Sequence, residues 1–71
     1  MKNYDNTILL ADCYYNMNDY QESIIYYQKA QSMIPSKFLP CYMICKAYQE
    51  LGDPKMIVYA KEVVNKTIKK D

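Results

Sequence analysis

The sequence predicts an all-α fold in which two helix-turn-helix hairpins follow one another in a single domain over residues 1–71. Three observations support this prediction. Apolar residues recur with the helical spacing of amphipathic helices, and similar side chains recur in the two halves of the chain at one constant offset. The third is the scarcity of Gly (1) and Pro (3), which argues against disorder and loop-rich folds. Hydrophobic residues make up 51% of the chain, which is enough to form a core. A domain this short is nevertheless only marginally stable.

The constant offset aligns apolar and turn residues of the two halves. Its length, about 34 residues, is typical of helical hairpins that stack side by side. We therefore expect one unit at about residues 4–37 and a second at about 38–71. The aligned pairs are Leu10 with Ile44, Tyr14 with Tyr48, Asn18 with Gly52, Asp19 with Asp53, Ile24 with Val58, Ala30 with Val64, and Ile34 with Ile68.

The first unit reads as helices at about residues 4–17 and 20–33. Asn18 separates them, because Asn tolerates the left-handed conformation that ends a helix. Asp19 is then expected to cap the second helix by accepting backbone N–H bonds, with Glu22 as its capping-box partner.

The second unit repeats this pattern with helices at about residues 38–51 and 54–68. Gly52 is the chemical equivalent of Asn18 as a helix stop, and Asp53 is expected to cap the last helix. Pro54 then falls at the first helical position, where its missing N–H costs nothing.

Prolines also mark the junction between the two units. Pro35 blocks continuation of the second helix. Ser36 or Lys37 begins the third helix, in whose first turn Pro40 is tolerated.

These residues resemble the tetratricopeptide repeat from residue 4 to about residue 70. The matching positions are Leu10, Ala11, Tyr14, Asn18, Asp19, Tyr20, Ser23, Tyr27, Ala30 and Pro35 in the first unit, and Ile44, Cys45, Tyr48, Gly52, Asp53 and Val64 in the second. The second unit departs from the pattern at Ile57, Lys61 and Lys69, where Ala, an aromatic residue and Pro are usual. The resemblance implies tandem antiparallel hairpins in a short right-handed α-α superhelix, acting as a scaffold or protein-interaction module that binds a peptide or partner protein on its concave face.

Close packing explains the pattern physically. Small residues such as Ala11, Ser23 and Ala30 let helices approach closely, and large residues such as Leu10 and Tyr27 are expected to fill the spaces between them. Three further large residues, Tyr14, Tyr20 and Tyr48, match core positions, and Cys45 stands at a small position.

The resemblance also places a partner-binding groove on the first helix of each unit. The groove residues it implies are Asp5, Ile8, Asp12, Tyr15, Asn16, Tyr42, Lys46, Gln49 and Glu50. Tyr15 and Tyr42 are expected on this exposed inner face, because tyrosine is enriched at protein interfaces. Tyr26 and Tyr59 are expected to lie toward the outer side. One subgroup of the family clamps carboxylates with Lys and Asn on its first helix. Ile8 and Asp12 occupy those places here, so we do not expect a carboxylate clamp.

Composition argues against several other functions. All 9 basic residues are Lys and the net charge is +1, so we expect no nucleic-acid partner. The chain has no His, which removes the commonest general base and metal ligand, and we expect neither an enzyme nor a cofactor. Cys13, Cys41 and Cys45 are an odd number, which does not describe a disulfide framework in a short chain and favours a reducing compartment such as the cytoplasm. Cys41 and Cys45 share a helix face, so they either pack as small apolar residues or give an incomplete zinc ligand set.

A second, fainter resemblance covers residues 30–66. This stretch, above all Met-Ile-Pro-Ser-Lys-Phe-Leu-Pro-Cys-Tyr at residues 33–42, is similar to the C-terminal repeats of O-antigen polymerase or ligase-type membrane proteins of Bacteroides-like bacteria. It implies the alternative function of a soluble structural or regulatory appendage of a membrane polysaccharide polymerase. The segment itself has no apolar run near the ~18 residues of a membrane span, so we expect no insertion.

The last predicted helix has more apolar residues than one contact face needs. They are Met56, Ile57, Val58, Ala60, Val63, Val64 and Ile68. We expect either self-association as a homodimer through this helix or continuation of the repeats in a longer protein.

Overall fold

The computed structural model describes residues 2–68, with side chains described through Lys66. It consists of α1 (Lys2–Asn16), α2 (Tyr20–Met33), α3 (Phe38–Leu51) and α4 (Met56–Ile68). The all-α prediction is confirmed, and the bounds of α2 and α3 are as expected. The side chain of Ile68 and residue Lys69 lie outside the described part.

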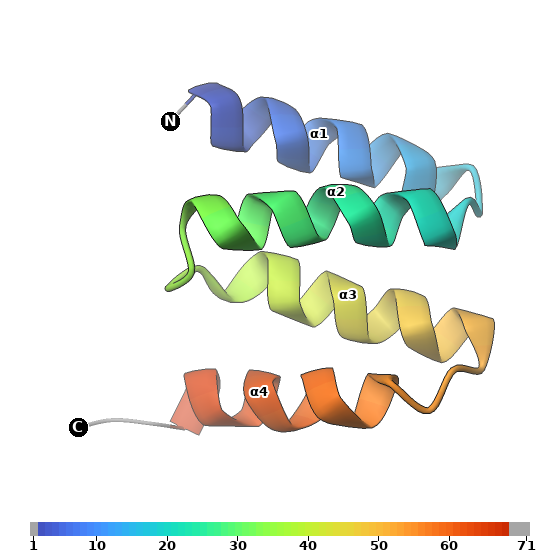
Figure 1. The fold of residues 1–71 in the computed structure, drawn as a ribbon, viewed down its shortest axis with the longest axis vertical. Helices are drawn as coiled ribbons and strands as arrows, with labels where there is room; N and C mark the ends of the chain where they lie inside the picture. Colours follow the sequence, from blue (N-terminus) through green and yellow to red (C-terminus); the bar gives the residue numbers. More distant parts are fainter. Residues whose placement is uncertain (1, 69–71) are drawn as a thin grey trace.

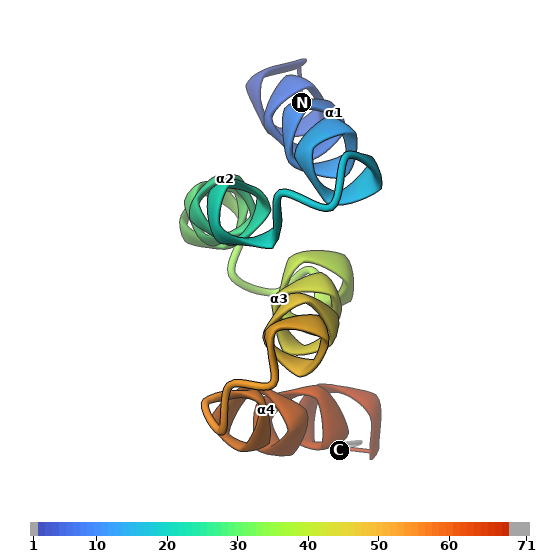
Figure 2. The same ribbon diagram turned by 90° about the vertical axis from the view of Figure 1, so that its right-hand side faces the viewer.

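The four helices form an open stack (Figure 1). Each helix packs extensively against its neighbour in the chain, while α1 and α4 lie at opposite ends of the stack. Seen along the helices, α2 lies to one side of α1 and α3 (Figure 2). The stack measures 36 × 32 × 15 Å, so it is flat. This arrangement is that of two helical hairpins in sequence, not of a closed four-helix bundle.

The same turn ends the first helix of each hairpin. Asn18 has φ 64° and Gly52 has φ 68°, and no other described residue has a positive φ. In both turns the N–H of the following residue donates to the carbonyl four residues before the stop, at 2.9 Å. The prediction that Asn18 and Gly52 are equivalent helix stops is therefore confirmed.

The two second helices begin differently. Asp19 caps α2, and its carboxylate accepts from the N–H of Glu22 at 3.4 Å. The Asp53 carboxylate instead accepts from the N–H of Lys55 at 2.9 Å. The last helix begins two residues later than the approximate start predicted: α4 begins at Met56, and Pro54 lies in the turn before it and not at the first helical position.

Two equivalent pairs of tyrosine rings show that α4 is shifted by one residue. The rings of Tyr14 and Tyr26 stack with centroids 5.5 Å apart, and those of Tyr48 and Tyr59 lie 5.6 Å apart. Tyr48 follows Tyr14 at the repeat offset, but Tyr59 follows Tyr26 at an offset one position shorter. The start of α4 accounts for the direction of this shift. Its first three amides donate three residues back, each at 3.0 Å, and such tight turns rotate further per residue than an α-helix does.

The shift corrects the predicted alignment of α4. Val58 and Val64 were expected to match the buried Ile24 and Ala30, but their side chains are 62% and 50% exposed. At the shortened offset, the equivalents of Ser23, Tyr27 and Ala30 are Met56, Ala60 and Val63, each of them half-buried. Lys61 therefore does not occupy the aromatic position of the repeat.

The core lies around α2. Its buried cluster comprises Ala11 on α1, Ile24 and Tyr27 on α2, and Ile44 and Ala47 on α3. Among the described residues, α4 adds no fully buried side chain.

Leu10 does not belong to this core, contrary to the prediction. Its side chain is 42% exposed, whereas Ile44, its equivalent in the second unit, is 0% exposed. The reason is position in the stack: α2 covers the Ile44 side of α3, and no described helix covers the Leu10 side of α1. No helix within residues 2–68 is long and apolar enough to cross a membrane.

The contrast between these equivalent positions gives a paired test. We expect Ile44→Ala to lower the free energy of unfolding by about 2–5 kcal/mol, because it leaves a cavity in the core. Leu10→Ala should cost less than about 1 kcal/mol, because the side chain is partly in water already. Urea denaturation of both variants measures the difference, and equal losses would show that Leu10 is a core residue after all.

Candidate partner-binding face

The predicted groove residues come from two helices on the same side of the stack. α1 supplies five of them and α3 supplies four, and we call this surface the α1/α3 face (Figure 2). Its members are Asp5, Ile8, Asp12, Tyr15, Asn16, Tyr42, Lys46, Gln49 and Glu50. Tyr15 shows that the two sets are close: its pKa is raised first by burial and then by the charges of Glu50, Tyr20 and Tyr42.

The α3 half of the face is apolar and aromatic. Tyr42 stacks on Phe38 with ring centroids 5.5 Å apart, and the Lys46 ammonium lies 5.7 Å from the Tyr42 ring. Phe38, Leu39 and Tyr42 are 40%, 42% and 39% exposed. This contact places the positive charge of Lys46 over the Tyr42 ring.

The prediction missed Phe38 and Leu39. Leu39 follows Asp5 at the same offset that relates Leu10 to Ile44, so the repeat itself could have identified it. Phe38 precedes it by one position and joins the face through its contact with Tyr42.

The α1 half is more buried than its α3 equivalent. Ile8 and Tyr15 are both half-buried and pack against the core cluster. Tyr15 also meets Tyr20 edge to face, with centroids 5.1 Å apart. Tyr15 is therefore less exposed than expected, while Asp5 and Asn16 are exposed.

Asp12 has a structural partner. The hydroxyl of the buried Tyr27 donates to the Asp12 carboxylate, joining α2 to α1. Burial raises the pKa of Tyr27, and the hydrogen bond to Asp12 and its negative charge raise it further. Asp12 is thus held in place on the face, half-buried, with carboxylate lone pairs beyond the one that Tyr27 uses.

The remaining tyrosines of the second helices are not on the outer side. Tyr26 and Tyr59 are half-buried, and the ring of each contacts a first-helix tyrosine of its own hairpin, Tyr26 in a stacked and Tyr59 in a tilted arrangement. The expectation that they lie outward was wrong for this reason.

The thiols of α3 contact the backbone of α4. Cys41 donates to the carbonyl of Tyr59 at 3.7 Å, and Cys45 to that of Met56 at 3.5 Å. Burial raises the pKa of the Cys41 thiol, which disfavours the thiolate that metals bind. Within residues 2–68, no three or more Cys, Asp, Glu or His side chains gather as metal ligands would. The two cysteines therefore act as small residues at the α3–α4 contact.

Comparison with known proteins identifies the first hairpin. The family profile described as "Tetratricopeptide repeat" matches residues 8–37. Residues 8–37 are a tetratricopeptide repeat. The match covers most of α1, the turn, α2 and the loop to α3. The second hairpin repeats the helix arrangement of this tetratricopeptide repeat.

Neither the curated proteins nor the solved structures compared with the chain gave a match. The resemblance to membrane O-antigen polymerases or ligases has no support in these comparisons.

The Tyr27–Asp12 hydrogen bond predicts a pH dependence of stability. Because the folded state holds the Tyr27 proton more tightly than the unfolded chain, this contribution is complete below the ordinary pKa of 10.0 and declines as the pH rises above it. We expect Tyr27→Phe to lower the free energy of unfolding by about 1.5 kcal/mol at neutral pH. This value is at the low end for a hydrogen bond to a charged group, because Asp12 is only half-buried.

Denaturation of wild type and Tyr27→Phe at pH 8 and pH 10.5 (about half a unit above that pKa) isolates this effect, because lysine titration is common to both proteins. The stability gap between them should narrow at the higher pH. A gap that widens or stays constant contradicts the assignment.

Proposed function

We propose that this domain is a protein-interaction module that binds a peptide segment on the α1/α3 face. The observation that carries the proposal is the exposure of Phe38, Leu39 and Tyr42 on one side of α3, beside Ile8 and Tyr15 of α1. Exposed apolar and aromatic side chains that lie together, rimmed by charges, are typical of binding surfaces. Tetratricopeptide repeats in general serve in protein–protein interaction and are typically non-catalytic.

The charges on the face favour a basic partner. Asp5, Asp12 and Glu50 are acidic, and Lys46 is the basic residue among the nine predicted positions. The Lys46 ammonium also already contacts the Tyr42 ring. The face therefore fits a segment with an apolar or aromatic anchor followed by Lys or Arg, and it disfavours a carboxylate terminus.

A selection experiment tests this chemistry. Peptides selected from a random display library on the immobilised domain should share one apolar anchor and a neighbouring Lys or Arg. Because Leu39 and Tyr42 supply the exposed contact area, the double variant Leu39→Ser, Tyr42→Ser should bind a selected peptide at least tenfold more weakly, as measured by calorimetry.

Ile25→Ser provides the matched control, because Ile25 is exposed on α2 and lies outside the α1/α3 face. It should bind as wild type does. Equal weakening by the control, or selected peptides that are uniformly acidic, would contradict the proposal.

A further inference from the structure

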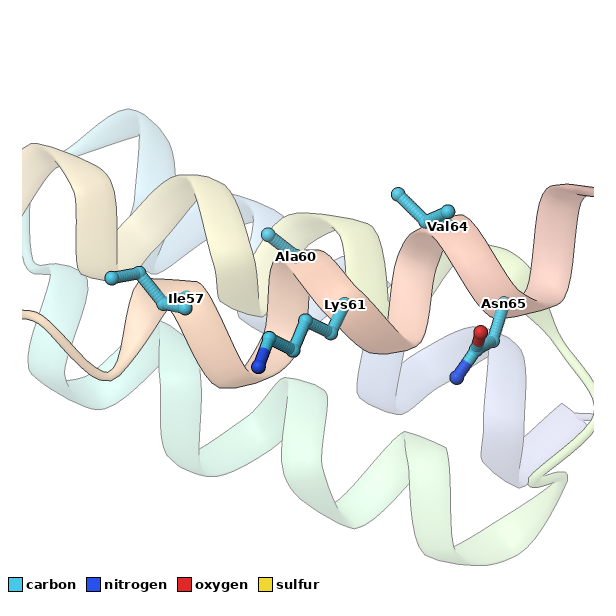
Figure 3. Close-up of a pocket in the computed structure, with 5 residues that line it drawn as sticks. All are labelled: Ile57, Ala60, Lys61, Val64 and Asn65. Atoms are coloured by element: carbon cyan, nitrogen blue, oxygen red, sulfur yellow. The ribbon is translucent and has the colours of Figure 1, made fainter.

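The outer side of α4 carries a shallow apolar hollow. It has a volume of about 410 Å³ and is lined by Ile57, Ala60, Lys61, Val64 and Asn65 (Figure 3). Ile57 is 56% exposed and projects from the first turn of α4. We call this surface the α4 outer face.

The corresponding side of α2 is covered within this chain. At the shortened offset that relates Tyr26 to Tyr59, Ile57 and Ala60 are the equivalents of Ile24 and Tyr27. Ile24 and Tyr27 are 4% and 0% exposed, and they form one cluster with Ile44 of α3. The α4 outer face is thus the surface on which the second hairpin's equivalent of α3 would pack. The hollow follows from Ala60, whose methyl group stands where α2 has a tyrosine ring.

The outer side of α1 is the complement of this surface. Leu10 and Cys13 are exposed. Their equivalents on α3, Ile44 and Ala47, are completely buried in the cluster that α3 forms with α2. The same stripe ends in Met17, which is 65% exposed. The chain therefore exposes, at its two ends, both halves of an interface that it already forms once inside.

We infer that a second copy of this chain packs its α1 on the α4 outer face, head to tail, and repeats the α2–α3 interface. Leu10 of the second copy occupies the hollow beside Ile57 and Ala60, as Ile44 lies beside Ile24 and Tyr27. This goes beyond the proposed peptide binding and uses neither Leu39 nor Tyr42. Since each added copy presents the same exposed face again, the association is open-ended and does not stop at a symmetric dimer.

The size of the contact sets its strength. One helix pair buries less than the ~1,600 Å² of a standard interface, so the association is weak and grows with concentration. Leu10, Cys13 and Met17 are all uncharged, and the hollow contains Lys61 alone as a charge, so no like-charge repulsion opposes the contact.

Two complementary variants test the head-to-tail geometry. Leu10→Glu damages the α1 side and Ile57→Glu damages the α4 side, and a buried carboxylate opposes association at either place. In sedimentation at millimolar concentration, wild type should exceed the mass of a dimer, and each variant alone should be a monomer. An equimolar mixture should form a dimer, because each variant keeps one intact face.

Other outcomes overturn the inference. A wild type that stays monomeric removes it. A Leu10→Glu variant that still self-associates, while Ile57→Glu stays monomeric and the mixture contains no dimer with one copy of each variant, shows a symmetric contact between two α4 helices instead. Ile25→Glu, at an exposed site of α2, is the matched control and should associate as wild type does.

Alkylation of the wild-type chain tests the same contact without relying on variants that could misfold. Cys13 lies on the α1 stripe that the second copy covers, whereas Cys41 is buried in either state. Alkylation of Cys13, followed by mass spectrometry, should slow severalfold between micromolar and millimolar protein. A rate that does not change with concentration contradicts the inference.

Discussion

Burial of Tyr27 between three helices is the interaction on which the rest of the structure depends. Its ring lies in one cluster with Ala11 of α1 and with Ile44 and Ala47 of α3, and its hydroxyl donates to Asp12 on α1. A buried hydroxyl without a partner would cost free energy, so this hydrogen bond is what allows a tyrosine in the core. Tyr27 thereby connects the first hairpin internally and also joins it to the second.

The flat stack follows from this single core. α2 has neighbours on two sides, so its small and large residues are buried toward both α1 and α3. Because α1 and α3 both pack on α2, they lie on the same side of the stack and share one exposed face (Figure 2). At the ends, the outer sides of α1 and α4 repeat the chemistry of surfaces that are buried in the middle. One set of packing rules thus accounts for the core, for the proposed peptide face and for the proposed contact between copies.

The turns and most helix bounds could be predicted from the sequence because local residues determine them. Asn18 and Gly52 adopt the left-handed conformation for reasons that hold in any short segment, and Asp19 caps α2 as its position predicts.

The alignment of α4 could not be predicted in this way. Three short-range hydrogen bonds at its start rotate the helix in the direction of the observed shift, and a constant repeat offset does not represent that rotation. The exposure of Leu10 was missed because periodicity identifies an apolar face but not whether another helix covers it. On the candidate face, family positions supplied Tyr42 and Lys46, and the repeat offset from Asp5 could have supplied Leu39, while Phe38 emerged only from its ring contact with Tyr42.

The most direct test of a core centred on α2 is amide hydrogen exchange, followed residue by residue in dilute solution, where copies do not associate. Amides exchange slowly where the surrounding structure must unfold globally, and faster where local opening suffices. The arrangement predicts the strongest protection in α2 between Ser23 and Ala30 and in the facing part of α3, with weaker protection in α4. Protection of α4 equal to that of α2 would contradict the open stack, because it requires a core that all four helices share.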